Sequence, residues 1–331
     1  MAHPSSVRAY VVDKPGGAFQ RGLASVPWAL LPEGEVLIRV AWSSVNFKDG
    51  LAAAVDGKVA RTYPLILGID LAGTVVESSV PTVRPGTEVI AHGYDLGTSH
   101  HGGFAEYASV PANWVVPLDG LSARDAMAIG TAGFTAAMAV AALEARGLEP
   151  ANGPVIVTGA SGGVGSTAIS ILSELGYEVW AATGKSEEHG WLETLGAVGF
   201  LSREECSVAG RPLESERWAG AVDAVGAATL PYILRTLRRG GAVAACGNSS
   251  GSDLATTVFP FILRGVSLLG MDSAYLPIET RRRLWARLAT DLRPRALGER
   301  VTEIGFDELE TALDAVRAGE ARGRWLVRIG A

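Results

Sequence analysis

The segment that most constrains the fold of this chain is Pro154–Ser166, with the sequence PVIVTGASGGVGS. Its first part, Val155–Val157, is typical of a buried strand, and Val164–Leu175 has the apolar spacing of a helix. A glycine-rich turn between strand and helix is typical of a dinucleotide site, because glycine lets the backbone approach a pyrophosphate and the helix N-terminus offers free N–H groups. Ala160 stands where the usual fingerprint has its first glycine, so the turn by itself also fits a plain structural turn.

Strand and helix patterns alternate along the chain after this turn. Helix patterns at Ser186–Leu195 and in the residues that lead to Leu237 separate short apolar runs. The expected strands are Val155–Val157, Glu178–Thr183, Gly220–Val225, Gly241–Cys246 and Val266–Gly270. Alternation of this kind predicts a doubly wound parallel sheet of the α/β class.

The first third of the chain has a different pattern, in which short runs are separated by turn residues. Within Glu35–Ala41, the side chains of Val36, Ile38 and Val40 alternate onto one face. The other expected strands are Val7–Val12, Leu65–Ile69, Gly73–Glu77, Thr87–Ala91, Phe104–Val110 and Trp114–Pro117. Several short strands at this spacing predict a β-barrel.

The strand patterns give way to helix patterns near residues 121–125. We therefore predict a barrel domain of residues 1–125, completed by residues 273–331, and a cofactor domain of residues 126–272. The further elements expected from the sequence are helices at Ala126–Ile129, Phe134–Glu144 and Ile278–Leu292 and a strand at Trp325–Ile329.

Composition and charge exclude several classes of protein. The chain of 331 residues is 48% hydrophobic and 19% charged, which predicts a globular protein. Its net charge of −6 and its lack of a basic run argue against nucleic-acid binding. No apolar run is expected to reach membrane-spanning length, and the first residues lack the features of a signal peptide. Two cysteines, Cys206 and Cys246, are too few for a disulfide framework, so a cytoplasmic location is expected.

The end of the second strand of the expected parallel sheet bears on the choice of cofactor. An NAD site usually has an acidic residue there, about 20 positions after the glycines, which binds the ribose 2′-hydroxyl. This chain has Thr183, Gly184 and Lys185 instead. A hydroxyl group, a glycine and a cation suit a 2′-phosphate, although Lys185 could also be a solvated surface residue. The pattern therefore favours NADP(H) over NAD(H).

Further motifs resemble those of the medium-chain dehydrogenase/reductase superfamily along essentially the whole chain. They are Trp42–Asp49 (WSSVNFKD), Gly68–Gly73 (GIDLAG), Gly130–Thr135 (GTAGFT), Pro260–Arg264 (PFILR) and Gly323–Arg324. Within the superfamily, the chain is similar to the zinc-free acryloyl-CoA reductases, a branch whose members also carry the name quinone oxidoreductase. The resemblance implies a GroES-like β-barrel catalytic domain together with a Rossmann cofactor domain.

Two of these motifs bear on a catalytic zinc ion. The zinc enzymes of the superfamily have a cysteine in the segment that matches Ser43–Asp49 and a histidine in a Gly-His-Glu motif that matches Gly68–Asp70. This chain has no cysteine in the first segment and Ile69 in place of the histidine. Zinc needs three or four nitrogen, sulfur or oxygen ligands, so we predict no metal site.

The resemblance also implies roles for single residues. Asn46 is expected to bind or orient the substrate and to donate to a developing enolate oxygen, and Asp49 to orient Asn46, to contact ribose or substrate, or to take part in proton transfer. Both residue types also favour turns and caps, which is the alternative for each. The implied cofactor residues are Phe47 at the nicotinamide; Ser161, Gly162, Gly163 and Val164 at the pyrophosphate; Thr183, Gly184, Lys185 and Arg203 at the 2′-phosphate; and Asn248, Ile262, Ser273 and Arg324.

The sequence therefore predicts an enzyme that uses NADPH to reduce an activated carbon–carbon double bond without zinc. The favoured substrate is acryloyl-CoA, and a quinone or enone reductase on the same scaffold is a close alternative. A non-catalytic NADPH-binding protein is an alternative of another class, against which Asn46, Asp49 and the Thr-Gly-Lys segment argue. We also expect a homodimer, because the apolar last strand Val266–Gly270 would otherwise leave an unpaired sheet edge.

Overall fold

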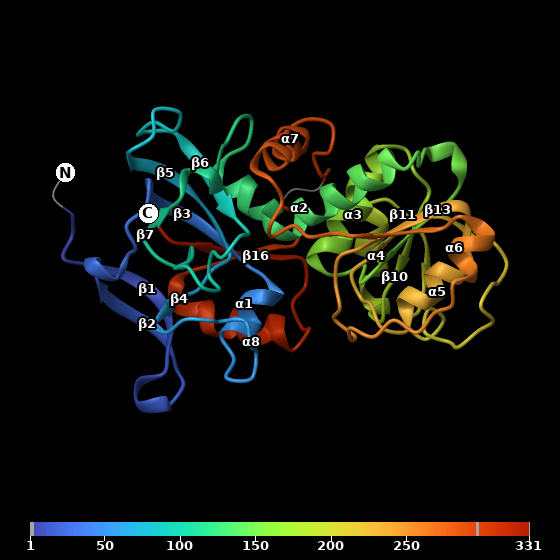
Figure 1. Cartoon of the computed structure of the whole chain (residues 1–331), viewed down its shortest axis with the longest axis horizontal. Helices are drawn as coiled ribbons and strands as arrows, with labels where there is room; N and C mark the ends of the chain where they lie inside the picture. Colours follow the sequence, from blue (N-terminus) through green and yellow to red (C-terminus); the bar gives the residue numbers. More distant parts are fainter. Residues whose placement is uncertain (1–2, 296–297, 331) are drawn as a thin grey trace. The chain divides into compact units, whose positions relative to one another are not determined.

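The computed structural model describes residues 3–295 and 298–330 and divides the chain into two compact units. The barrel unit comprises Met1–Thr131, Ala274–Ala289 and Leu297–Ala331, and the Rossmann unit comprises Ala132–Ser273 and Thr290–Ala296. This division differs from the predicted one in three places: the boundary falls six residues later, after Thr131, Ser273 belongs to the second unit, and residues 290–296 also join that unit. Figure 1 shows both units coloured along the sequence.

The barrel unit is built on two sheets. In the larger sheet the strand order is β15-β16-β3-β5-β6-β8, and β7 also pairs with β3. These strands are β3 (Val36–Val45), β5 (Asp70–Ser78), β6 (Glu88–His92), β7 (Tyr107–Val110), β8 (Val115–Pro117), β15 (Val301–Ile304) and β16 (Arg324–Arg328). The smaller sheet has the order β2-β1-β4, with β1 (Ser6–Asp13), β2 (Gln20–Pro27) and β4 (Leu65–Ile66).

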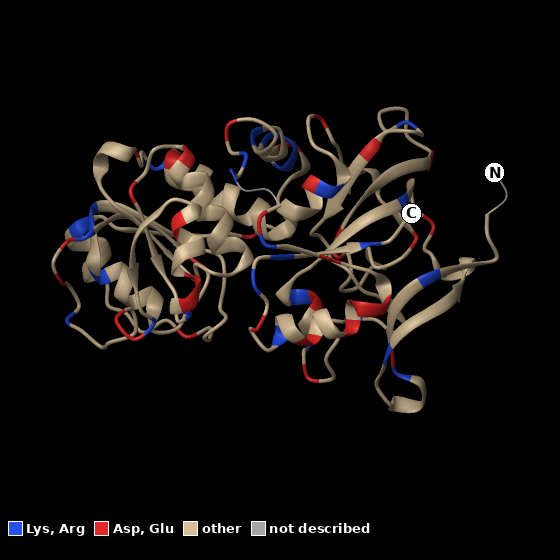
Figure 2. Ribbon diagram, turned by 180° about the vertical axis from the view of Figure 1, so that it is seen from behind, with Lys and Arg blue, Asp and Glu red and all other residues tan. Residues whose placement is uncertain are grey.

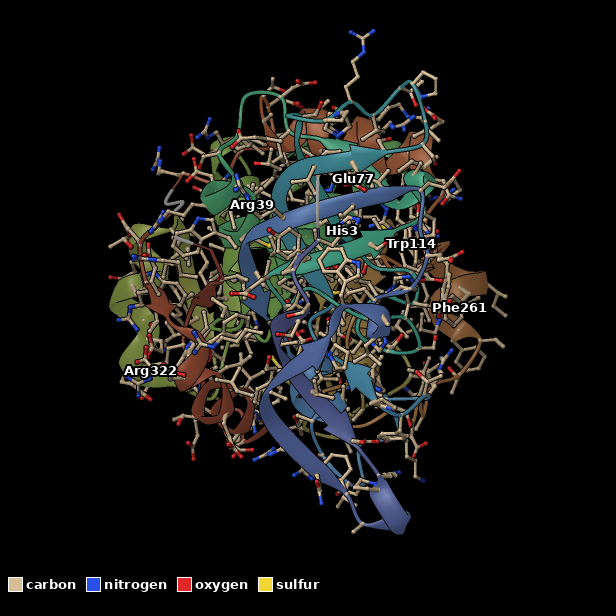
Figure 3. The ribbon with its side chains drawn as sticks, turned by 90° about the vertical axis from the view of Figure 1, so that its left-hand side faces the viewer. His3, Arg39, Glu77, Trp114, Phe261 and Arg322 are labelled. Atoms are coloured by element: carbon tan, nitrogen blue, oxygen red, sulfur yellow. The ribbon has the colours of Figure 1, made fainter. Side chains whose placement is uncertain are left out.

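The expected alternation of β3 is present, since Val36, Ile38 and Val40 are fully buried and pack in one apolar cluster. The sequence prediction missed β2, whose residues are mostly exposed and therefore show no inward stripe. It also missed β15, α1 (Phe47–Ala52) and α8 (Leu309–Arg317), while α7 is shorter than predicted and spans Ile278–Leu288. At the N-terminal edge, the His3 ring stacks on Trp28, and its Nε2 lies 3.7 Å from Glu77 Oε2. Figure 3 labels His3 and Glu77.

The Rossmann unit has one parallel sheet with the strand order β11-β10-β9-β12-β13-β14. Its strands are β9 (Val155–Thr158), β10 (Val179–Ala182), β11 (Ala197–Leu201), β12 (Trp218–Asp223), β13 (Leu237–Ala245) and β14 (Ser267–Gly270). The helices that connect them are α3 (Gly163–Glu174), α4 (His189–Thr194), α5 (Thr229–Thr236) and α6 (Phe259–Arg264). The predicted doubly wound parallel sheet is therefore confirmed, although β11 and α6 were not expected.

One helix, α2 (Ala123–Ala145), replaces the two short helices that the sequence predicts near the domain boundary. It contains a kink at Gly130, where φ is 53° and ψ is −165°. The prediction that no apolar run has membrane-spanning length is wrong for α2. By length and composition alone, this helix is long and apolar enough to cross a membrane. However, 83% of its most apolar stretch is buried inside the protein, so packing accounts for the apolar character of this helix.

Figure 2 shows Lys and Arg residues interspersed with Asp and Glu residues along the ribbon of each unit. The pairs include Arg124–Glu303 and Arg21–Asp314 in the barrel unit and Arg295–Glu174 in the Rossmann unit. Binding of nucleic acid depends on a broad basic face. The expectation that the chain does not bind nucleic acid stays a prediction.

Candidate active site

A fully buried carboxylate, Asp70, is the centre of a polar cluster in the barrel unit. It is the first residue of β5, and three neighbours reach it from β3, the residue after β3 and α2. Ser44 Oγ donates to Asp70 Oδ2 at 2.6 Å, and Asn46 Nδ2 donates to the same oxygen at 2.9 Å. The Thr131 backbone N–H also donates to Oδ2, at 2.9 Å, and the Thr131 hydroxyl donates to Oδ1. Each oxygen of this buried carboxylate is thus satisfied, as burial of a charge requires.

The positive charge of the cluster comes from Arg324, the first residue of β16, which pairs with β3. Its Nη2 donates to Ser44 Oγ at 2.9 Å and lies 4.0 Å from Asp70 Oδ2, while its Nη1 donates to Asn46 Oδ1 at 3.2 Å. Burial lowers the pKa of Arg324, and the charges of Asp70 and Asp49 oppose this shift. An arginine remains protonated in such a site, so the guanidinium group is a fixed cation against two carboxyl groups.

The kink at Gly130 leaves the space that this cluster occupies. A Cβ atom on Gly130 would come within 2.4 Å of Arg324 Nη2 and 2.7 Å of both Asp70 Oδ2 and Ser44 Oγ. The positive φ of 53° at the same position also disfavours any side chain. Glycine is therefore required here by both backbone conformation and space, and the kink brings Thr131 onto Asp70.

Asp49 fixes the backbone that carries Asn46. One oxygen of Asp49 accepts the Asn46 backbone N–H at 2.8 Å, and the other accepts the Ile69 backbone N–H at 2.9 Å. Burial and the nearby negative charge of Asp70 raise the pKa of Asp49 to about 7, against the two backbone donors, which lower it. Of the roles predicted for Asp49, these contacts correspond to orienting Asn46 at the start of α1.

A chain of hydrogen bonds continues from Asp70 into the interior. The Trp285 indole N–H donates to His92 Nε2 at 2.9 Å, while Arg281 Nη1 lies 2.9 Å from the same nitrogen and 3.0 Å from Nδ1. His92 Nδ1 lies 3.2 Å from the hydroxyl of Thr131, which in turn donates to Asp70. Burial and the charge of Arg281 keep the pKa of His92 well below its usual range, so the imidazole is neutral. The Thr131 hydroxyl group thus links the neutral ring of His92 to the carboxylate of Asp70.

The glycine-rich turn in the Rossmann unit has the shape of an anion cradle. Gly162 is the N-cap residue of α3, and Gly163 and Val164 form its first turn. A Cβ atom on Gly165 would come within 2.4 Å of the Gly159 carbonyl oxygen, so the turn can close this tightly only with glycine. The residues therefore fit a bound pyrophosphate at the start of α3.

The residues predicted for the 2′-phosphate lie together at the end of β10. The hydroxyl groups of Ser161 and Thr183 are 3.2 Å apart, and the Lys185 backbone N–H donates to Thr183 Oγ1 at 3.1 Å. The guanidinium group of Arg203 lies beside Gly184, since a Cβ atom there would be 3.4 Å from Arg203 Nε. The structure thus brings hydroxyl groups and an arginine to the place where a 2′-phosphate would bind.

The remaining predicted cofactor residues are more scattered. Phe47 is the first residue of α1 and is 44% exposed, and Asn248 is exposed beyond the end of β13. Ser273 Oγ accepts a hydrogen bond from Thr135 at 2.9 Å. Ile262 lies in α6, whose last residues contact the start of β13, and it is 68% exposed. Ile262 therefore lies apart from the predicted residues at the carboxyl ends of the strands.

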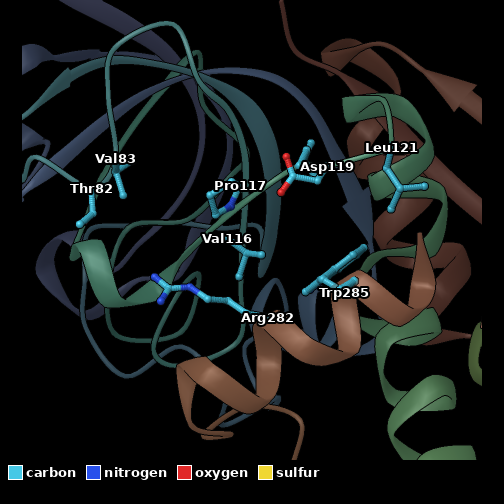
Figure 4. A pocket seen from close by; sticks show the side chains of 10 residues that line it. Thr82, Val83, Val116, Pro117, Asp119, Leu121, Arg282 and Trp285 are labelled. Carbon is cyan, nitrogen blue, oxygen red and sulfur yellow. The ribbon is translucent and has the colours of Figure 1, made fainter. Parts of the chain in front are cut away.

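Two further features of the described residues bear on the site: groups that could hold a metal ion, and a cavity beside α7. Within residues 3–295 and 298–330, no group of three or more His, Cys, Asp or Glu side chains is placed to hold a metal ion. A cavity of about 410 Å³ lies between α7 and β8, and Figure 4 shows Arg282 and Trp285 on one side of it and Val116 and Pro117 on the other. None of the predicted site residues lines this cavity.

Comparison with known proteins matches both units to families. The model for the alcohol dehydrogenase GroES-like domain matches residues 32–120, and the model for zinc-binding dehydrogenases matches residues 163–290. The acrylyl-CoA reductase AcuI of Ruegeria pomeroyi is 46% identical over 327 residues, which cover 98% of this chain and 99% of the relative. The predicted GroES-like and Rossmann folds are confirmed by these matches.

Two solved structures are similar over the same length. The yhdH oxidoreductase of Salmonella enterica in complex with NADP has a TM-score of 0.95 at 46% identity, and covers 98% of this chain and 100% of its own. The yhfP protein of Bacillus subtilis with NAD bound has a TM-score of 0.96 at 45% identity, with the same coverage. This chain belongs to the medium-chain dehydrogenase/reductase superfamily of oxidoreductases, in the branch that contains AcuI and YhfP.

Sequence analysis missed half of the buried cluster. It named Asn46 and Arg324 but gave no role to Ser44, Asp70 or His92. Asp70 stood in a motif used only for the resemblance, and its neighbours come from strands whose pairing the sequence does not reveal. The available signal was Gly130, since a glycine in the middle of an alanine-rich helix indicates a close approach of another group.

Proposed function

We propose that this protein is an NADPH-dependent reductase of an activated carbon–carbon double bond, with acryloyl-CoA as its substrate and propanoyl-CoA as its product. The observation that carries the proposal is the buried cluster of Asn46, Arg324 and Asp70. The cluster surrounds the side-chain amide of Asn46 with hydrogen-bonding groups and one cation, and it is not a set of metal ligands. Such a cluster suits a reaction in which negative charge develops on a substrate oxygen.

The chemistry divides between the cofactor and the chain. When bound, NADPH supplies a hydride that adds to the β-carbon of the enoyl thioester, and the electron pair of the double bond moves onto the carbonyl oxygen as an enolate. Asn46 has one N–H that makes a firm bond to Asp70 and a second whose contacts to Ser44 are long, at 3.3 and 3.4 Å. That second N–H is the donor we assign to the enolate oxygen. A proton from solvent at the α-carbon completes the reduction.

Arg324 and Asp70 hold the amide of Asn46 in one orientation. Arg324 donates to the amide oxygen and Asp70 accepts from the amide nitrogen. A flipped amide would therefore place its NH2 group against the N–H donor of Arg324. Asn46 is itself only 8% exposed. A pre-oriented donor in a site with little water stabilises a developing charge without reorganisation.

The cofactor assignment rests on the residues at the end of β10. A 2′-substituent would meet the hydroxyl group of Thr183 and the cations of Lys185 and Arg203. None of these three residues is acidic. The relative from Salmonella enterica binds NADP, whereas the relative from Bacillus subtilis was solved with NAD. The residues of this chain favour the phosphorylated cofactor because an anion at this place meets cations.

The test is NADPH consumption measured in parallel with acryloyl-CoA, crotonyl-CoA and a simple quinone. We expect the highest kcat/KM with acryloyl-CoA. A quinone reductase is the second candidate, because the relative from Bacillus subtilis is named for quinone oxidoreduction. Faster turnover of the quinone would favour that candidate, and tight NADPH binding without turnover of any compound would contradict both.

We further propose that the protein acts in the cytoplasm as a homodimer. β14 is the last strand of its sheet and pairs with β13 alone within the described residues. Large apolar side chains are exposed on α6, which precedes β14 in the chain, and on the residue before α6. Their exposed fractions are 61% for Val258, 45% for Phe259, 68% for Ile262 and 50% for Leu263. A second copy paired at β14 would cover this surface. Sedimentation as a monomer at micromolar concentration would contradict the dimer.

A further inference from the structure

A second cavity, in the Rossmann unit, is lined by three arginines. It has a volume of about 320 Å³, and the side chains of Arg146, Arg238 and Arg239 line it together with the apolar side chains of Leu143 and Leu148. The cavity also includes residues at the start of β12 and in the first half of β13. It therefore lies at the amino ends of the parallel strands, whereas the glycine-rich turn lies at their carboxyl ends.

Each of the three guanidinium groups is held in place by a neutral acceptor. Arg146 Nη2 donates to Ser267 Oγ at 3.0 Å, and Arg239 Nη1 donates to the Leu263 carbonyl oxygen at 2.8 Å. Arg238 Nη1 donates to the Asn152 carbonyl oxygen. Each bond uses only one of the five N–H groups of an arginine, so donors remain for a ligand.

No carboxylate neutralises these three arginines among the described residues, since none of them takes part in a salt bridge there. Other arginines of the same unit are paired: Arg235 with Glu214 at 2.9 Å and Arg264 with Glu216 at 3.7 Å. Like charges that share one cavity repel each other, and an anion between them removes that repulsion. Arg146 and Arg239 are exposed and Arg238 is half-buried, so water solvates the three charges when no ligand is bound, and an anion that enters the cavity meets three cations.

The backbone around the cavity is shaped for Arg238. A Cβ atom on Gly153 would come within 2.1 Å of Arg238 Nη1, so the guanidinium group occupies the space of an absent side chain. Gly153 has a φ of 119°, which also disfavours other residues. Gly147, Gly240 and Gly241 line the cavity without side chains, which leaves room for a ligand between the arginines.

We propose that this cavity binds a phosphate-bearing small molecule at the edge of the sheet opposite the cofactor. Guanidinium groups bind phosphate oxygens through paired N–H bonds, and three of them suit a group with two or more negative charges. The apolar side chains of Leu143 and Leu148 offer a surface for an organic part of the ligand. The shared chemistry is the phosphate group, whether the ligand is inorganic or a nucleoside diphosphate.

The experiment is calorimetric titration of the full chain, saturated with NADPH, with pyrophosphate, inorganic phosphate and ADP. Saturation with NADPH keeps these ligands out of the cofactor site. We expect binding that Arg238→Ala and Arg239→Ala each weaken about 10-fold or more, on the scale of a lost charge-assisted bond. Arg238→Lys is expected to retain part of the affinity. Tighter binding of ADP than of pyrophosphate would identify an organic phosphate, and equal binding the phosphate group alone.

The matched control is Arg211→Ala, which removes one exposed positive charge from the same unit outside the cavity. This variant is expected to bind pyrophosphate like the unchanged protein. The dissociation constant of NADPH and the melting temperature, measured for every variant, separate a lost site from a lost fold. The proposal is overturned if no ligand binds at millimolar concentration, or if binding is equal in the Arg238, Arg239 and Arg211 variants.

Discussion

The cluster around Asp70 and the glycine-rich turn of the Rossmann unit are built in opposite ways. In the cluster, side chains from distant parts of the sequence meet, and Arg324 binds Asn46 across 278 positions. The turn is a short continuous segment whose shape comes from its own backbone, since Gly165 packs on Gly159 six residues before it. A local motif can thus be recognised in a sequence, whereas a long-range network exists only once the strands have paired.

The two regions also differ in what their polar groups do for stability. The groups of the cluster are buried, and each charge depends on a partner inside the protein. At the end of β10, Gly184 and Arg203 are exposed and Lys185 is half-buried, so water solvates them when no ligand is bound. Removing a charged group from the first region should therefore lower the free energy of unfolding, whereas substitutions in the second region should change only the binding of ligand.

The largest effect is expected for Arg324→Ala, which leaves Asp70 without its buried cation. We expect a loss of about 3–5 kcal/mol in the free energy of unfolding at pH 7, the usual cost of breaking a buried ion pair. The measurement is urea unfolding. The control is Arg328→Ala on the same strand, whose exposed pair with Glu303 at 3.3 Å should contribute about 0–1 kcal/mol. Equal losses in the two variants would remove the energetic contrast between the regions.

The next largest effect is expected for Lys185→Ala at the cofactor edge. The dissociation constant of NADPH should rise about 10- to 100-fold, because a charge-assisted bond to the 2′-phosphate is lost. The dissociation constant of NADH and the free energy of unfolding should stay the same. Fluorescence titration with both cofactors at fixed salt measures this. Equal losses for NADPH and NADH would mean that Lys185 supports the loop and not the phosphate.

A smaller effect is expected for Thr131→Val, which removes the hydroxyl group between His92 and Asp70 but keeps the side-chain shape. Turnover should fall about 3- to 10-fold, on the scale of one neutral hydrogen bond. Thr131→Ser should restore turnover, because serine returns the donor to Asp70. Steady-state kinetics at saturating NADPH are the readout. If serine and valine variants are equally slow, the methyl group and not the hydroxyl group matters.

A further prediction concerns Asp49 and pH. Its pKa is raised from 3.8 to about 7 in the folded protein, so the folded state holds the proton more tightly than the unfolded state does. The stability that this proton contributes is complete below pH 3.8 and is lost as pH rises through about 7. As pH rises between these two values, the free energy of unfolding of the unchanged protein should therefore fall relative to that of the Asp49→Asn variant. Parallel pH profiles of the two proteins would contradict this.

The same contrast explains what the sequence could predict. The parallel doubly wound sheet and the turn before α3 follow from alternation and local motifs, and the structure has them. The strand order and β11 were not predicted. The short elements α1 and α6 have only six residues each, too few for a helical period to show. β2 is largely exposed and has no apolar stripe to reveal it.

The buried cluster was predictable only in part, for a physical reason. The sequence indicated Asn46 and Asp49 because both lie in the motif Trp42–Asp49, which includes the start of α1. Asp70 meets His92 because β5 and β6 pair in the register that sets these two residues opposite each other. Nothing in either strand alone fixes that register, and the path from Asp70 to Thr131 depends on the kink at Gly130.

The central claim is that Asn46, held by Arg324 and Asp70, stabilises charge on the substrate. Its most direct test compares kcat for acryloyl-CoA with the dissociation constant of NADPH in Asn46→Ala, with Asn113→Ala at an exposed position as the control. We predict that kcat falls about 100-fold, the effect of one lost oxyanion donor, while NADPH affinity stays unchanged. An unchanged kcat in a folded Asn46→Ala protein would contradict the account.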